Sequence, residues 1–278
     1  MTFNSPRFKT ETQLGRIETG HDVLVRGSHG RHVHLLQMAL IDLGFAMPIS
    51  TASQDFSPDG SYGRETEAAV EAFQRKNPPL KPDGKIGQNT IREIDKQIGG
   101  MKHRVRLHFR SLSLSDVPFD LMLSSAQRAY AQYGIEIFFA SGESLGLSDE
   151  EAKRFSVVGQ NCGWSLDSGE FAALHALGSS VPNNDIKVFI VNKFQESNVL
   201  GCGGHAAGKP ACAVTHDSSR WDMAHEVGHV LLTSGFAPVH SGSTRNLMFG
   251  TSSNGPTPLA LTDKQIAKIR ASPLCRAI

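Results

Sequence analysis

Hydrophobic residues recur at helical spacing through the first third of the chain. Four of them lie on one helix face between Val33 and Leu43, and a second apolar stripe runs through residues 66–73. The phrase Asp-Gly-x-apolar-Gly-x-x-Thr begins at Asp59 and returns 24 residues later. Each copy predicts a tight turn that needs glycine, followed by the start of a helix. The pattern therefore predicts three short helices joined by these turns.

After residue 100 the pattern becomes typical of strands mixed with helices. Polar and apolar residues alternate over 103–110, which predicts a half-buried strand, whereas 186–191 is almost wholly apolar and predicts a central one. Further elements are predicted as a helix at 118–133, closed by Gly134, and as strands at 135–139 and 211–215. Strict alternation of strand and helix is missing, so the predicted fold class is α+β.

Gly99 and Gly100 mark the expected boundary between the two halves, because paired glycines end a helix and provide a flexible joint. The expected organisation is an N-terminal tail at 1–20, a helical domain at 21–98 and a second domain at 101–278.

The composition excludes two kinds of partner. The 28 basic residues are balanced by 27 acidic ones, so the chain has no basic field for nucleic acid. No apolar run approaches the roughly 20 residues that would span a membrane. The polar N-terminus also lacks the apolar core of a secretory signal, so export would use a route without a recognisable signal peptide.

Four cysteines, Cys162, Cys202, Cys212 and Cys275, all lie in the second half and allow three pairings. Cys202 and Cys212 flank a glycine-rich stretch, so a disulfide that closes this short loop is one expectation. Four buried thiols are the alternative.

Residues 21–98 resemble the small peptidoglycan-binding module of bacterial wall-active enzymes. Both Asp-Gly turns carry the resemblance, together with residues in the family's order: Val33, Leu36-Gln37, Leu40, Leu43-Gly44-Phe45, Ala69-Val70 and Phe73-Gln74. The resemblance implies binding to bacterial cell-wall glycopeptide. A helical spacer without a ligand is the alternative.

A candidate metal-binding motif of the second half is the stretch His225-Glu226-Val227-Gly228-His229. Residues four apart share one face of a helix, so the two imidazoles can bind one ion. Glu226 points about 100° away, which disfavours it as a third ligand but lets it reach a water on the metal as a general base. A solvated helix face is the alternative.

A catalytic zinc usually takes three protein ligands and one water. After the histidine pair, the next residue able to bind a metal firmly is His240. Gly235 is expected to end the helix in a left-handed conformation, and Pro238 stops any continuation. His240 is therefore the predicted third ligand, and His216 and His205 are the competing ones.

The His-Glu-x-x-His motif, a glycine, a third histidine and a downstream Met248 resemble the metzincin clan of zinc peptidases, over residues 101–278. The resemblance implies a twisted mixed sheet with an active-site helix, and zinc with His225, His229 and His240 as ligands. It also implies Glu226 as general base and Met248 in a turn beneath the metal. An ordinary core methionine is the alternative for Met248.

The spacing departs from the clan's pattern. Gly235 comes six residues after His229 where the clan has three, and His240 follows after five more. The three extra residues before Gly235 are close to one added helical turn. Phe249 stands where some members of the clan have tyrosine.

These patterns predict a zinc-dependent endopeptidase targeted to the bacterial cell wall, which hydrolyses peptide bonds by a metal-activated water with Glu226 as general base. Its substrate is wall peptide or an envelope protein, and its location is the periplasm, the cell wall or the outside. In one alternative the N-terminal domain is an autoinhibitory prodomain of a secreted protease; no cysteine lies at the domain joint, and Cys162, well inside the second half, is the thiol that would occupy the zinc. In another, the chain binds wall without catalysis and holds a structural zinc closed by His216 or His205.

Overall fold

The computed structural model describes residues 3–9, 11–52, 58–112, 119–159, 169–250 and 259–278. The chain divides into two compact units. The first comprises Met1–Lys102 with two later segments, Ala131–Ile135 and Leu261–Ile266. The second comprises His103–Tyr130, Glu136–Ala260 and Ala267–Ile278. The sequence does not indicate that two segments of the C-terminal half belong to the first unit.

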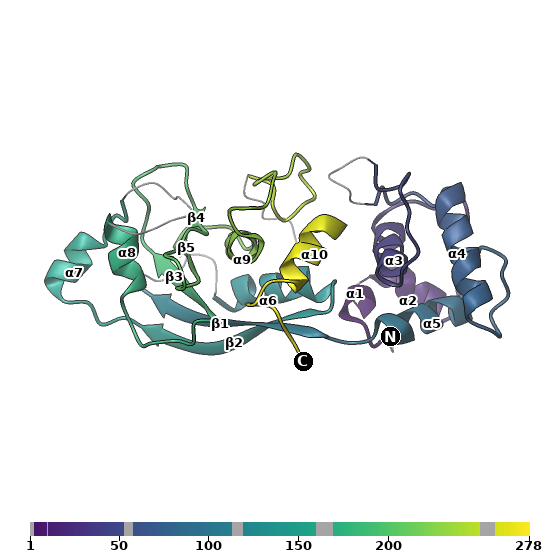
Figure 1. Cartoon of the computed structure of the whole chain (residues 1–278), viewed down its shortest axis with the longest axis horizontal. Helices are drawn as coiled ribbons and strands as arrows, with labels where there is room; N and C mark the ends of the chain where they lie inside the picture. Colours follow the sequence, from purple (N-terminus) through teal and green to yellow (C-terminus); the bar gives the residue numbers. More distant parts are fainter. Residues whose placement is uncertain (1–2, 10, 53–57, 113–118, 160–168, 251–258) are drawn as a thin grey trace. The chain divides into compact units, whose positions relative to one another are not determined.

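Helices make up the first unit, drawn in purple and blue in Figure 1. They are α1 (Pro6–Lys9), α2 (Thr12–Glu18), α3 (Arg31–Asp42), α4 (Arg64–Lys76) and α5 (Gln88–Ile98). The last three form the bundle that the apolar spacing predicts. Phe8, Leu14 and Ile17 are buried in the same core as the bundle. The stretch expected as a tail therefore contributes two short helices to this core.

A buried glutamine holds the first Asp-Gly turn. Gln37 of α3 donates from Nε2 to Asp59 Oδ1 (3.0 Å), the carbonyl of Ser61 (3.1 Å) and Thr66 Oγ1 (3.0 Å). Its Oε1 accepts the backbone N–H of Gly60 at 3.0 Å. Gly60 has φ 71°, the left-handed conformation that glycine adopts without penalty. The turn is thus fixed by one fully satisfied side chain.

The second turn is held in the same way, one helix later. Gln74 of α4 donates to Asp83 Oδ1 (3.2 Å), the carbonyl of Lys85 (2.8 Å) and Thr90 Oγ1 (3.2 Å), and accepts the N–H of Gly84 (3.0 Å). Gly84 has φ 66°. The repeat in the sequence is therefore a repeat of one hydrogen-bonded arrangement, in which a glutamine clamps an Asp-Gly turn. Each turn has an aspartate, a glycine and a threonine because the glutamine bonds to all three.

We expect Gln74→Ala to open the second turn and leave the first one closed. The substitution removes the acceptor of the Gly84 amide and leaves buried polar groups unpaired, which costs about 1–3 kcal/mol. Hydrogen exchange followed by NMR would then show loss of protection at Gly84. Gly60, held by Gln37, is the internal control. Equal loss of protection at both glycines would show that the clamps are not independent.

The second unit is built on one mixed sheet. Its strands are β1 (His103–Ser111), β2 (Ile135–Ser144), β3 (Ile186–Val191), β4 (Gly201–Cys202), β5 (Ala211–Thr215) and β6 (Arg276–Ala277). The order is β2-β1-β3-β5-β4, with β6 paired to β1. β3 runs parallel to both β1 and β5, whereas β4 is antiparallel to β5. The apolar strand 186–191 is central, as its composition predicts.

The remaining helices are α6 (Phe119–Ala131), α7 (Asp149–Arg154), α8 (Gly169–His175), α9 (Asp222–Leu232) and α10 (Asp263–Arg270). α9 packs against β5 and β4 (Figure 1) and is buried at ten of its eleven positions. The predicted fold class, α+β with a helical bundle before a mixed sheet, is confirmed. Among the described residues no helix combines the length and apolarity needed to cross a membrane.

Candidate metal centre

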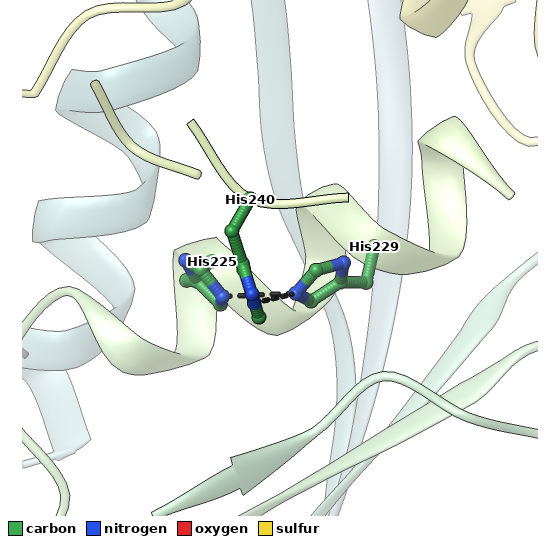
Figure 2. A group of neighbouring side chains, drawn as sticks. All are labelled: His225, His229 and His240. Carbon is green, nitrogen blue, oxygen red and sulfur yellow. Dashed lines mark hydrogen bonds between the residues drawn. The ribbon is translucent and has the colours of Figure 1, made fainter. Parts of the chain in front are cut away.

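Three histidines converge above α9. His225 and His229 come from successive turns of that helix, and His240 comes from the chain that follows it (Figure 2). The Nε2 atom of His229 lies 2.9 Å from Nε2 of His225 and 3.2 Å from Nε2 of His240. Within the described residues, these three form the group whose ligand atoms could share one metal ion. The structure thus brings together the three residues that the sequence favoured.

The donor set fits a tetrahedral zinc ion. Zinc–nitrogen bonds of about 2.0–2.1 Å put two tetrahedral ligand nitrogens about 3.3 Å apart, close to the separations found here. His225 Nδ1 lies 2.7 Å from the carbonyl of Leu247, which can only accept, so Nδ1 carries the proton and Nε2 keeps its lone pair. Burial lowers the pKa of all three imidazoles, that of His229 to about 3. The rings are therefore neutral, and each can offer a nitrogen lone pair to a metal ion.

Glu226 lies between α9 and the edge strand β4. Only 6% of its surface is exposed, and its carboxylate accepts the N–H of Gly203. A Cβ atom at Gly201 would overlap the carboxylate, and one at Gly203 would lie 2.5 Å from His229 Cβ. Burial, and then the charge of Asp222, raise the pKa of Glu226 well above its usual value. A carboxylate with a raised pKa is a stronger base for a proton held by water.

The end of α9 differs from the expectation. The helix ends at Leu232, and the positive φ expected at Gly235 occurs instead at Thr233, with φ 66° and ψ 169°. The residues inserted before Gly235 therefore lie in the loop and do not add a helical turn. The N–H of Ser241 donates to the carbonyl of Met248 at 2.7 Å, which fixes the backbone beside His240. That bond, rather than the length of the helix, sets the position of His240.

Met248 packs against α9 at Gly228, which lies between the two helical histidines in the sequence. Its side chain is fully buried against α9, where a Cβ atom at Gly228 would lie 2.5 Å from Sδ and 3.2 Å from the hydroxyl of Tyr130. Asn246 Oδ1 accepts the N–H of Met248 at 2.8 Å and closes the turn. The sequence analysis singled out Met248 but not Gly228, which has to lack a side chain to admit it. The position of Gly228 between the two histidines is the sequence feature that could have indicated this role.

The other candidate ligands lie elsewhere. Neither His205 nor His216 belongs to the group of three within the described residues, and His205 Nδ1 donates to the carbonyl of Ala206 at 2.9 Å. The expected Cys202–Cys212 disulfide is wrong. Cys212 is a buried free thiol on the fully buried strand β5, whereas Cys202 is disulfide-bonded. Cys162 lies outside the described residues.

The helical unit has a cavity of its own. It measures about 850 Å³ and lies beside the second Asp-Gly turn, where Gln74, Asp83, Lys85 and Asn89 contribute to its wall. Lys85 and Asn89 are exposed there. This cavity is large enough for part of a glycopeptide, since ligand sites commonly measure about 300–1,000 Å³.

Among the comparisons with known proteins, the clearest sequence similarity lies in the N-terminal part of the chain. Residues 29–94 match the family model described as "Putative peptidoglycan binding domain". A stretch of 72 residues is 40% identical to the probable N-acetylmuramoyl-L-alanine amidase of Bacillus licheniformis. That stretch covers 26% of this chain and 18% of the amidase, so the chain spans under a fifth of that relative.

Solved structures offer weaker likenesses. Metalloproteinase-II of Bacteroides fragilis is 14% identical and covers 60% of this chain and 52% of its own, with a TM-score of 0.41. The archaemetzincin of Methanopyrus kandleri is 10% identical, with coverages of 60% and 94% and a TM-score of 0.37. The archaemetzincin of Archaeoglobus fulgidus is 13% identical, with coverages of 59% and 99% and a TM-score of 0.34.

We expect Gly228→Ala to destabilise the chain, although glycine to alanine normally stabilises a helix. The new methyl would overlap Met248 Sδ, and overpacking of a core typically costs about 1–3 kcal/mol. Thermal unfolding measures the effect. Shortening the methionine in the double variant Gly228→Ala, Met248→Ala should make the alanine at 228 less harmful than it is alone. Full additivity of the two substitutions would contradict the packing described here.

Proposed function

We propose that the chain is a zinc-dependent peptidase that acts at the bacterial cell wall. The proposal rests on the convergence of three neutral imidazole nitrogens, two from α9 and one from the loop after it. A buried carboxylate, that of Glu226, lies on the same helix. His225, His229 and His240 would hold the ion. An open fourth position is what distinguishes a catalytic zinc site from a structural one, and three protein ligands leave that position for water.

Bound zinc would polarise the scissile carbonyl and make the attacking water more acidic. Glu226 would take the proton of that water, because its raised pKa favours the protonated carboxyl after transfer. The same carboxyl would then give the proton to the leaving amine. The N–H of Gly203 holds the carboxylate in place throughout, and the Leu247 carbonyl keeps His225 in the tautomer that binds metal.

The N-terminal module would direct this chemistry to the wall. Its support is the match of residues 29–94 to a peptidoglycan-binding model and the identity shared with an amidase. The proposed substrates are peptide bonds of the wall or of proteins held near it, and the proposed location is outside the cytoplasm. A cavity beside the second Asp-Gly turn is the proposed contact with wall glycopeptide.

Glu226→Gln is expected to keep one zinc ion per chain and to lose activity by about 100-fold or more, since general-base catalysis typically contributes that much. Elemental analysis measures the zinc, and release of peptides from purified wall and from casein measures the activity. His240→Ala, as the comparison, should lose zinc as well as activity. Near-full activity of Glu226→Gln would refute the proposed base, and inactivity of the zinc-loaded wild type on both substrates would refute the peptidase.

Asn89→Trp in the full chain is expected to reduce co-sedimentation with purified cell wall several-fold, because the indole would fill part of the module's cavity. Ala68→Trp places the same group at an exposed position of α4 outside that cavity and should bind wall like the wild type. Casein cleavage should be unchanged in both variants. Equal sedimentation of both variants and the wild type would exclude this cavity as the contact with wall.

A further inference from the structure

A second cavity lies in the sheet unit, at the amino ends of β3 and β5. It measures about 330 Å³. Asp185 and Lys187 line it at the start of β3, Lys209 lines it just before β5, and His175 lines it at the end of α8. Its lining includes none of the residues of the candidate metal centre. The cavity therefore needs an explanation separate from peptide hydrolysis.

His175 is the unusual residue of this cavity. Only 5% of its surface is exposed, and its ring stacks on Phe189 with centroids 5.3 Å apart and an interplanar angle of 14°. Neither ring nitrogen has a hydrogen-bond partner among the described residues. Burial lowers the pKa of His175 to about 3, so the ring is neutral and offers one donor and one acceptor. Buried polar atoms are nearly always paired in proteins, which points to a ligand that supplies the partners.

The negative charge of Asp185 is already paired with other side chains, so it does not balance the lysines of the cavity. Its carboxylate is 1% exposed and accepts from Arg106 Nε at 3.1 Å and from Arg276 at 2.5 Å. His108 Nε2 lies 2.9 Å from the same carboxylate. Two guanidinium groups thus more than neutralise the single carboxylate.

The lysines are left with an excess of positive charge. Burial lowers the pKa of Lys187, and repulsion from Arg110 and Lys209 lowers it further, against an opposing effect of Glu143. Glu143 itself pairs with Arg110 at 3.0 Å. Because Asp185 pairs with Arg106 and Arg276, and Glu143 pairs with Arg110, neither carboxylate is left to balance the charges of Lys187 and Lys209. An anion in the cavity would relieve this repulsion.

We propose that this cavity binds a small molecule that carries an oxyanion, either a carboxylate or a phosphate group. Lys187 and Lys209 hold the oxyanion, and His175 hydrogen-bonds a neighbouring polar atom of the same molecule. Ser180 and Asn183, which also line the cavity, add donors that suit anionic oxygen. The assignment goes beyond the proposed peptidase function and stands whether or not the chain cleaves peptides.

The test is calorimetric titration of the zinc-loaded full chain with sodium phosphate and, separately, with sodium succinate. Sodium chloride keeps the ionic strength constant, so that general screening does not vary. We expect saturable binding of at least one of the two ions, and the ion that binds more tightly identifies the source as a phosphate or a carboxylate. Absence of saturable binding for both ions would overturn the proposal.

Two variants locate the binding. Lys209→Ala should weaken it about tenfold, the size of one lost charge-assisted contact. Lys193→Ala, which removes an exposed lysine outside the cavity, should leave the affinity unchanged. His175→Phe keeps the stacking on Phe189, so it should fold with an undiminished melting temperature and yet bind the ion several-fold more weakly. Equal affinities of Lys209→Ala and Lys193→Ala would place the ion elsewhere and overturn the assignment.

Discussion

The backbone of the turn from Asn246 to Phe249 determines where two of the three histidines point. The carbonyl of Leu247 takes the Nδ1 proton of His225, and the carbonyl of Met248 takes the N–H of Ser241, next to His240. One turn therefore sets the tautomer of the helical His225 and the position of the loop that carries His240. The turn is itself anchored, because the N–H of Leu247 donates to the carbonyl of Ala260 at 2.7 Å. These backbone bonds thus connect α9, the loop at His240 and the segment at Ala260 through one turn.

Close approach of backbone to α9 is the second constraint. Gly201 and Gly203 of the edge-strand segment and Gly228 of the helix leave no room for a Cβ atom. Their lack of side chains lets β4 and Met248 press against the helix from two directions. The resulting burial disfavours the charged form of the Glu226 carboxyl and so raises its pKa. Gly201 and Gly203 therefore allow the close packing that raises the pKa of Glu226, and Gly228 allows the close packing of Met248.

The sequence predicts what depends on local pattern. The helices of the bundle, the two turns and the central strand follow from spacing and glycine placement, and the four-residue separation of His225 and His229 determines their shared helix face. Long-range geometry is harder to predict. The residue with positive φ is Thr233 instead of Gly235. Cys202 pairs with Ala213 across β4 and β5, so the side chain of Cys212 points to the opposite face of the sheet, which the flanking glycines do not indicate. Phe8 and Ile17 join a core that is visible only once the bundle is assembled.

The three histidines differ in what holds them, and the difference would decide how binding of the proposed zinc ion is coupled to folding. His225 and His229 sit on a helix buried at almost every position, whereas His240 is exposed on a loop. Packing keeps the helical pair in place, while the loop ligand relies on the Ser241–Met248 bond and on the ion itself. Because metal binding adds to folding free energy where the site would otherwise loosen, zinc would contribute mainly to the order of the loop between Thr233 and Met248. The helix would keep His225 and His229 oriented without zinc, so the proposed site would be preformed at the helix and completed by the ion at the loop.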